Sequence, residues 1–334
     1  MPVAETPVTT VDVAVLGPDS PQGQAVLAAL AESRLARRVH ALSTGGAPGR
    51  LVEFGDDQIA VNPPEDFDYS GVALVFLCNP ADLSAQERER LGVAGVPVID
   101  CCGGLGPSPA RPRVVAEINP ERLAEAVGGG VACPTALAAV LALVLAPLQR
   151  RFGLEAVQVS TYEAVGGLGR SGVRALDQEV RELLNFRTPE QAYFGRTLAF
   201  NVLPIVEAGP DEVVDDLRSV LDEPGLPVAL ARVRVPVFHG DGVAVFARLG
   251  SAVNTVDVEA ALAGGPGLEM VSGEGEPPSP LTEAAVGEGV YVSLLSGGAG
   301  GDRTVRLWVA VDAVRRGLGL NAVRVAELLL KEYL

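Results

Sequence analysis

The sequence is poor in several residue types on which enzyme chemistry often depends. Its 334 residues include two histidines, His40 and His239, and a single lysine, Lys331. We therefore expect neither a histidine-rich metal site nor a Schiff-base lysine. A Ser-His-Asp triad would need one of the two histidines, and no serine lies in the Gly-x-Ser-x-Gly pattern that favours one. The sequence thus predicts no metal cofactor.

Other scarcities bear on the compartment and the partners. Four cysteines without metal-like spacing, together with an N-terminal stretch that lacks an apolar core, predict a cytoplasmic protein with reduced thiols. The apolar run from Ala136 to Leu145 has ten residues, whereas a bilayer span takes about 20. The formal charge of −16 argues against nucleic acids and anionic membranes as partners, because both attract basic surfaces.

The length allows one large or two medium domains, and alternating apolar and helical segments predict the α/β class. A strand, a glycine-bearing turn and a helix open the chain, in the order of a dinucleotide-binding unit whose helix N-terminus can receive a pyrophosphate. The strands expected by pattern are Val11–Leu16, Val39–Leu42, Val72–Leu77, Val96–Asp100, Ala156–Tyr162 and Leu307–Asp312. A polar helix is expected over Leu83–Leu91 and an amphipathic helix at the C-terminus.

The chain is organised around the stretch from Gly128 to Leu148. Val131-Ala132 predicts a short strand, and Pro134 suits the first turn of a helix. Because Ala136 to Leu145 are all Ala, Val or Leu, this helix is expected to be buried on every side. A nucleophile such as Cys133 would here lie at the positive end of a helix.

This stretch resembles the nucleophile segment of the aspartate-semialdehyde dehydrogenase family, Ala-Asn-Pro-Asn-Cys-Ser-Thr followed by an apolar helix that ends in Pro-Leu. Pro134 and Pro147 keep the family's spacing of thirteen residues. In this register the reactive cysteine falls on Ala136, and Cys133 takes the position of the first asparagine.

The resemblance extends from Val11 to Leu334. Val114–Asn119 is similar to Val-Val-Pro-Glu-Val-Asn, and Ala199–Pro204 to Ala-Phe-Asn-Val-Ile-Pro. The Phe-Gly-Arg at 194–196 is typical of a diverged bacterial paralogue group. The family implies a Rossmann-type parallel-sheet dinucleotide domain plus an α+β catalytic-type and dimerisation domain. We place a disordered tail at 1–10, the first domain at 11–132, the second at 133–312, and at 313–334 a helix that packs back on the first.

The positions that carry the family's chemistry differ here. Arg234 is retained as the residue for the substrate carboxylate, whereas Asp241 fills the acid/base histidine position and His239 lies two residues before it. Glu163 replaces a substrate-positioning glutamine, and Gly106 a phosphate-holding arginine. The positions implied for the cofactor are Gly17, Ser20, Gly23, Ser43, Thr44, Gly46 and Ala313. Ser20 crowds the phosphate path, Gly46 takes the place of the arginine that grips the 2′-phosphate, with Arg50 within reach, and Ala313 replaces an asparagine near the nicotinamide.

The family oxidises its aldehyde through a cysteine thiolate, with NADP as hydride acceptor. With Ala136 and Asp241 in the two catalytic positions, we expect a catalytically impaired homodimer with a binding, regulatory or structural role. Its NADP binding should be weak, and a small anionic metabolite is a possible ligand. The alternative is an active oxidoreductase that uses Cys133 as nucleophile with His239 or Asp241 as base. The sequence names no pathway.

Overall fold

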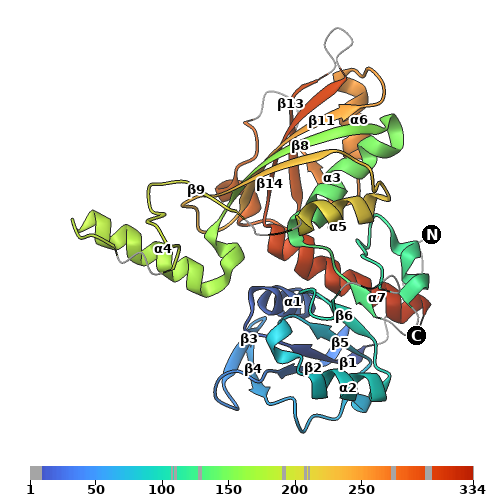
Figure 1. Ribbon diagram of the computed structural model, residues 1–334, viewed down its shortest axis with the longest axis vertical. Coiled ribbons are helices and arrows are strands. Elements are labelled where there is room, and N and C mark those ends of the chain that lie inside the picture. Colours follow the sequence, from blue (N-terminus) through green and yellow to red (C-terminus); the bar gives the residue numbers. More distant parts are fainter. Residues whose placement is uncertain are drawn as a thin grey trace. The chain divides into compact units, whose positions relative to one another are not determined.

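The computed structural model describes residues 10–106, 108, 111–126, 130–189, 193–206, 209, 211–271, 276–297 and 303–333. Of the expected N-terminal tail, only Thr10 belongs to the described residues. The chain forms two compact units, residues 1–135 with 318–334, and residues 136–317. Each contains a seven-stranded sheet flanked by helices (Figure 1). The α/β fold class predicted from the sequence is confirmed.

The first unit is built on a mostly parallel sheet in the order β3-β4-β2-β1-β5-β6-β7, in which only β3 is antiparallel to its neighbour β4. Its strands are β1 (Val11–Leu16), β2 (Ala36–Leu42), β3 (Leu51–Phe54), β4 (Asp57–Asn62), β5 (Leu74–Leu77), β6 (Val98–Asp100) and β7 (Val131–Ala132). The central strands β1 and β5 are almost entirely buried, as near-continuous apolar runs in a covered parallel sheet should be.

Serine side chains cap the N-termini of two helices in this unit. The predicted helix over Leu83–Leu91 is α2 (Ala85–Ala94), because Ser84 Oγ caps its first turn and Gly95, at φ +63°, ends it. Helix α1 (Pro21–Glu32) begins after the cap Ser20. The last helix, α7 (Asn321–Glu332), packs against α1 and the short helix η3 (Pro120–Ala126).

The buried Asn321 attaches α7 to the first unit. Its side chain donates to the carbonyl of Val114 and accepts from the N–H of Ala116, both at 2.9 Å. Arg324 pairs with Glu117 one turn further along α7. The C-terminal helix is therefore an integral part of the unit that begins the chain.

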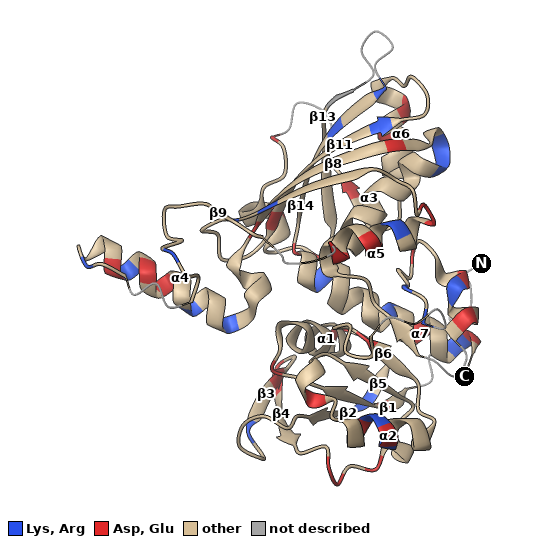
Figure 2. Cartoon of the chain, viewed as in Figure 1, with Lys and Arg blue, Asp and Glu red and all other residues tan. Residues whose placement is uncertain are grey.

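The second unit contains a mixed sheet in the order β12-β13-β14-β11-β8-β10-β9. Its strands are β8 (Leu154–Glu163), β9 (Leu203–Pro204), β10 (Val228–Arg234), β11 (Asp241–Leu249), β12 (Leu268–Met270), β13 (Val290–Gly297) and β14 (Thr304–Val311). Its helices are α3 (Ala136–Phe152), α4 (Gly169–Leu184), α5 (Glu212–Leu221) and α6 (Thr255–Ala263). Acidic and basic residues follow one another along α4 (Figure 2).

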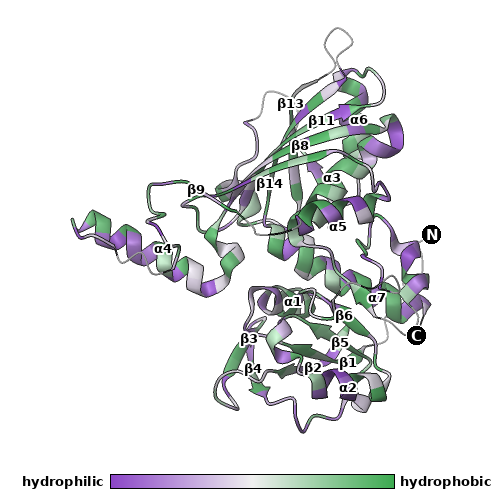
Figure 3. Ribbon diagram, in the orientation of Figure 1, coloured by the Kyte–Doolittle hydropathy of each residue, from purple (hydrophilic) through white to green (hydrophobic). Residues whose placement is uncertain are grey.

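Helix α3 is the core of this unit. Every residue from Leu137 to Ala146 is buried, and the helix packs against α5, α6 and β11. Figure 3 shows the apolar character of α3 and of the neighbouring strands. The buried apolar helix predicted here is confirmed, but it begins at Ala136, so Pro134 lies before its first turn.

Within the described part of the chain, no helix is long and apolar enough to cross a membrane. The same residues hold no group of three or more His, Cys, Asp or Glu side chains arranged to bind a metal ion.

Candidate functional site

The turn between β1 and α1 has the tight backbone of a dinucleotide-binding turn. Gly17 has φ +84°, and a Cβ on it would lie 2.3 Å from the Cβ of Asn79. A Cβ on Gly23 would lie 2.1 Å from the carbonyl oxygen of Gly17. Both predicted glycine positions therefore require glycine for close packing of the turn.

The donors of this turn are largely taken or missing. Ser20 Oγ accepts a hydrogen bond from the N–H of Gly23 at 2.9 Å, which caps α1 from within the chain. Pro18 and Pro21 carry no N–H. A pyrophosphate needs these N–H groups at the start of the helix, so the turn fits the dinucleotide fold better than it fits the phosphates themselves.

Ser43 and Thr44, both predicted to contact the cofactor, donate hydrogen bonds to a carboxylate of the chain. Asp82, which is 1% exposed, accepts from both hydroxyls, at 2.9 Å and 2.8 Å, and from the N–H of Thr44 at 2.6 Å. Asn79 donates to its second oxygen at 2.9 Å. A buried negative charge at this loop opposes an incoming 2′-phosphate.

The missing arginine at Gly46 is replaced in space by Arg50. Gly46 has φ +81°, and a Cβ on it would lie 3.1 Å from Nε of Arg50. The Arg50 guanidinium is paired with Asp19 of the β1–α1 turn. A positive charge therefore lies near the position of the family's arginine, but the carboxylate of Asp19 already pairs with it.

Ala136 is the first residue of α3, so the predicted nucleophile position does lie at a helix N-terminus. The backbone approaches it closely, because a Cβ on Gly317 would lie 2.2 Å from the carbonyl oxygen of Ala136. The position has the favourable field of a helix start but carries only a methyl group.

Cys133 lies in a different environment. Its Sγ is 4.0 Å from Sγ of Cys101, and its N–H donates to the carbonyl of Asp100 at 2.8 Å. The hydrogen bond with Cys101 and burial raise the pKa of the Cys133 thiol well above its usual range. A thiolate, the form that attacks carbonyls, is therefore disfavoured at Cys133.

Glu163 is held between two arginines at the ends of β8 and β10. Arg232 binds it with both nitrogens of a bidentate pair, Nε at 2.6 Å and Nη2 at 3.0 Å. Arg234, opposite Glu163 in the register of the two strands, has its Nη2 3.7 Å from the second carboxylate oxygen and donates to the carbonyl of Ala164 at 2.9 Å. The residue predicted to bind a substrate carboxylate thus already faces one from its own chain.

Asp241, in the predicted acid/base position, joins three strand ends. One carboxylate oxygen accepts from the N–H of Ala164 after β8 at 2.8 Å, and the other from the N–H of Ala313 after β14 at 3.3 Å. Removal from water raises the pKa of Asp241 to about 7, although the two N–H groups act against this shift. The backbone N–H of Ala313, a predicted cofactor residue, therefore donates to Asp241.

His239 does not share a face with Asp241. Residues 235–240 lie outside the strands, and Gly240 turns the chain at φ +82° before β11 begins. The imidazole is exposed and lies over Gly166, where a Cβ would be 2.7 Å from Nδ1. Residues two apart share a face only within a continuous strand. Because this turn separates His239 from β11, the two side chains do not share a face.

Two charged side chains that contact the predicted site residues, Arg232 and Asp82, were not predicted from the sequence. Arg232 lies two residues before Arg234, and period-two spacing in a strand should have placed both on one face. Asp82 is the last residue of a short helix that begins after Asn79 and follows β5. In the sequence, the Asn79-Pro80 dipeptide is only a turn signal. Its hydrogen bonds to Ser43 and Thr44 depend on the neighbouring loop and had no local signature.

Known proteins resemble the chain over both units. The family model for the semialdehyde dehydrogenase NAD-binding domain matches residues 12–126, and the model for the semialdehyde dehydrogenase dimerisation domain matches residues 145–316. A USG-1 protein homologue of Pseudomonas aeruginosa is 34% identical over 97% of this chain and 98% of its own. An aspartate-semialdehyde dehydrogenase of Shewanella violacea is 27% identical over 96% of this chain and 98% of its own.

Two solved structures are similar over nearly the whole length. Aspartate semialdehyde dehydrogenase II from Vibrio cholerae, in complex with ASA, has a TM-score of 0.90 at 28% identity and covers 98% of this chain and 100% of its own. A probable aspartate-semialdehyde dehydrogenase from Pseudomonas aeruginosa has a TM-score of 0.88 at 34% identity, with the same coverage.

Proposed function

The chain belongs to the semialdehyde dehydrogenase family, and we propose that within it this protein is a member without dehydrogenase activity that serves a binding, regulatory or structural role. The observation that carries the proposal is Ala136 at the first residue of α3. Covalent catalysis on an aldehyde needs a thiolate, and a methyl group forms no bond to a carbonyl carbon.

The base position supports the same proposal. Both oxygens of Asp241 are engaged by backbone N–H groups at strand ends, so its carboxylate connects β8, β11 and β14. Glu163 meanwhile lies against Arg232 and Arg234, the groups that would hold an anionic substrate. An incoming carboxylate would have to compete with Glu163, so any anionic metabolite should bind weakly there.

One observation favours the alternative of an active oxidoreductase with relocated groups. A carboxyl group with a pKa of about 7 is suited to proton transfer at neutral pH. The raised pKa of Cys133 opposes this alternative, because a base without a nucleophile does not complete the covalent reaction.

The cofactor residues fit NADP poorly. The N–H of Gly23 is already bound to Ser20 Oγ, so it is not free to donate to a phosphate. Asp82, beside Ser43 and Thr44, has the same sign of charge as the phosphates. We propose an NADP dissociation constant no tighter than roughly millimolar, about −4 kcal/mol. Titration calorimetry measures it, and a micromolar constant would contradict the proposal. Asp19→Asn, which releases Arg50, should tighten NADP but not NAD.

We also propose a cytoplasmic homodimer. The match to a dimerisation domain supports it, as does a set of exposed apolar side chains in the second unit, which are Leu184, Phe186, Phe200 and Val202. Large exposed apolar side chains such as these are the kind that an interface covers.

The activity itself is tested with purified protein, aspartate semialdehyde, NADP and phosphate. We expect no phosphate-dependent formation of NADPH, because no thiolate is available at Ala136 or Cys133. NADPH formation that is lost in Cys133→Ala would overturn the proposal and establish the relocated nucleophile. Cys78→Ala, a buried cysteine of the same unit, is the matched control.

A further inference from the structure

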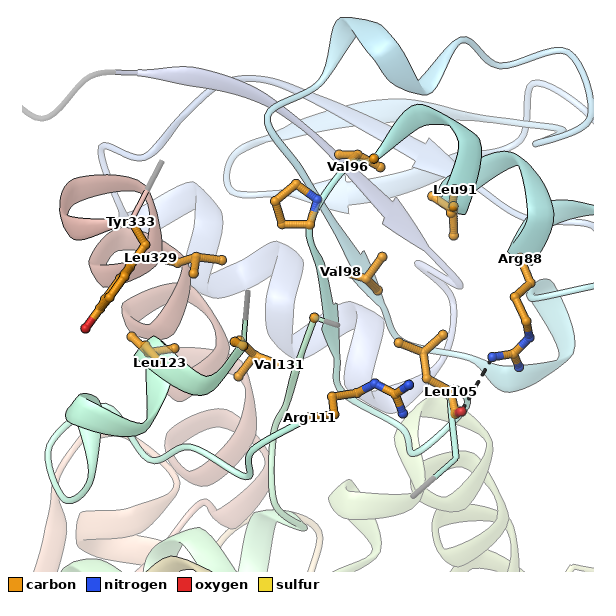
Figure 4. A pocket seen from close by; sticks show the side chains of 15 residues that line it. Arg88, Leu91, Val96, Val98, Leu105, Arg111, Leu123, Val131, Leu329 and Tyr333 are labelled. Atoms are coloured by element: carbon orange, nitrogen blue, oxygen red, sulfur yellow. Dashed lines mark hydrogen bonds between the residues drawn. The ribbon is translucent and has the colours of Figure 1, made fainter. Parts of the chain in front are cut away.

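A cavity lies within the first unit, and the turn and loop implied for the cofactor do not line it. It has a volume of about 480 Å³ and is bordered by α2, β6, β7, η3 and α7 (Figure 4). None of the residues from Gly17 to Gly23 or from Ser43 to Gly46 lines it. Its size is within the range of roughly 300–1,000 Å³ that small-molecule sites occupy.

The walls of this cavity are largely apolar. Leu91, Val98, Leu123, Val131 and Leu329 contribute buried side chains from five different elements. Gly130 brings two backbones together, since a Cβ on it would lie 2.6 Å from the carbonyl oxygen of Val98. The cavity can therefore accept an apolar body with a gain from its removal from water.

The face of α2 that lines the cavity carries two glycines, Gly92 and Gly95. Arg88, Leu91, Gly92 and Gly95 line the cavity at helical spacings of three, four and seven, so they share one face. Gly95 is required by its φ of +63°, but Gly92 is in the helix, where glycine costs about 0.5–1 kcal/mol relative to alanine. A Cβ on Gly92 would meet nothing within 4 Å. Packing therefore does not demand glycine there, while its absence of a side chain leaves the cavity open.

The two arginines of the cavity lie at one end, and the hydroxyl of Tyr333 lies at the other (Figure 4). Arg88 and Arg111 reach toward Leu105 from opposite sides in Figure 4. Arg88 donates to the carbonyls of Gly104 at 2.9 Å and Leu105 at 3.5 Å, and Arg111 donates to the carbonyl of Gly106. Carbonyls are neutral acceptors, and in the described part of the chain no carboxylate pairs with Arg88. A positive charge thus borders an apolar cavity at one end, in a protein whose net charge is −16.

We propose that this cavity is a binding site for a small amphipathic carboxylate, with its head at Arg88 and Arg111 and its apolar body along Leu123, Val131 and Leu329. A guanidinium carries five N–H donors in a planar fork that matches a carboxylate, so Arg88 can keep its bonds to the loop and still receive the head. The proposal goes beyond the proposed function and stands independently of it, because the cavity shares no residue with the Glu163 and Asp241 cluster.

The test measures binding of octanoate and 3-phenylpropanoate to the full-length protein by titration calorimetry, each beside its uncharged primary amide. The amides keep the shape and lose the charge. We expect each acid to bind about tenfold or more tightly than its amide, and that difference to disappear in Arg88→Gln. Arg34→Gln removes the same charge from an exposed position of the same unit outside the cavity, and should leave affinity unchanged.

Gly92→Leu tests the location. Its side chain enters the open space on the face shared with Arg88 and Leu91, and should abolish binding of acids and amides alike. Thermal unfolding should show an equal or raised melting temperature, because leucine is the better helix former. Acids that bind no better than their amides, binding that survives Gly92→Leu, or an equal loss in Arg34→Gln would each overturn the proposal. NADPH formation in the enzymatic assay would leave it untouched.

Discussion

At the scale of single residues, Asp241 occupies the predicted acid/base position and is hydrogen-bonded to backbone N–H groups at two strand ends. Its carboxylate accepts from N–H groups that follow β8 and β14, so it holds strand ends together. Removal from water sets its pKa near 7, far above the value of about 3.9 in an unfolded chain. The protonated form is therefore the one that the folded state favours.

The raised pKa of Asp241 makes the stability of the protein depend on pH. Because the folded pKa is the higher one, the stability that Asp241 contributes is fully present below pH ~4 and is lost as the pH rises through ~7. We expect the free energy of unfolding of the wild type, minus that of Asp241→Asn, to fall by about 2–4 kcal/mol between these limits. Urea unfolding at several pH values measures it.

Asp12→Asn is a control of opposite sign. The hydrogen bond from Arg37 lowers the pKa of Asp12, so the same difference should grow as the pH rises. A difference for Asp241→Asn that stays constant or grows with pH would show that its carboxylate is already ionised in the folded protein at low pH.

The sequence predicts which residues occupy the family's site positions, but it does not predict the contacts that these residues make. The motif register placed Ala136, Glu163, Arg234 and Asp241, because it needs only spacing along the chain. The bonds of Asp241 depend on Ala313, which lies 72 residues away in sequence. The turn at Gly240 that separates His239 from Asp241 depends on a left-handed backbone conformation that many glycines could adopt.

At the scale of elements, helix α3 is where sequence and structure agree best. Ten consecutive Ala, Val and Leu side chains can only be satisfied by burial on all sides, and α5, α6 and β11 supply that burial. Strands β1 and β7 were predicted with their bounds for the same reason. Half-exposed elements such as β3 and β4 were not predicted, since their apolar positions are few and their boundaries are set by tertiary contacts.

The start of α3 provides a prediction of its own. A thiol at the first residue of a helix is shifted toward thiolate by the N–H groups and the dipole, whereas the hydrogen bond with Cys101, together with burial, raises the pKa of the Cys133 thiol. In Ala136→Cys, we expect iodoacetamide to alkylate the introduced thiol about tenfold or more faster than Cys133.

Mass spectrometry of peptides from the folded protein gives the rates. Ala139→Cys, one turn further into the buried helix, is the matched variant and should remain unmodified. Equal rates for the two introduced thiols would mean that the helix N-terminus no longer provides an activating field at this position.

At the scale of the whole molecule, the exposed apolar side chains of the second unit predict a dimer. Phe200 is 72% exposed and has φ +59°, a conformation that a large side chain adopts only when its surroundings impose it. We expect wild-type protein at submicromolar concentration to sediment as two copies of 34.5 kDa. An obligate dimer of this kind should bury upwards of about 2,000 Å² of accessible surface in its interface.

Phe200→Asp should dissociate this dimer. Aspartate tolerates a positive φ better than phenylalanine does, so the change removes the apolar contact without adding backbone strain. Leu51→Asp, at an exposed apolar position on β3 of the other unit, should leave the dimer intact. A folded wild-type species of 34.5 kDa would refute the dimer.

The attachment of α7 to the first unit has a consequence for the order in which the chain matures. Residues 136–317 are continuous, and all of them leave the ribosome before α7 does. The buried Asn321 and its bonds to Val114 and Ala116 form only when the last helix has been made. The unit that is synthesised first is therefore the unit that is completed last, and truncation of α7 during synthesis would leave a complete second unit in the same chain as an unfinished first one.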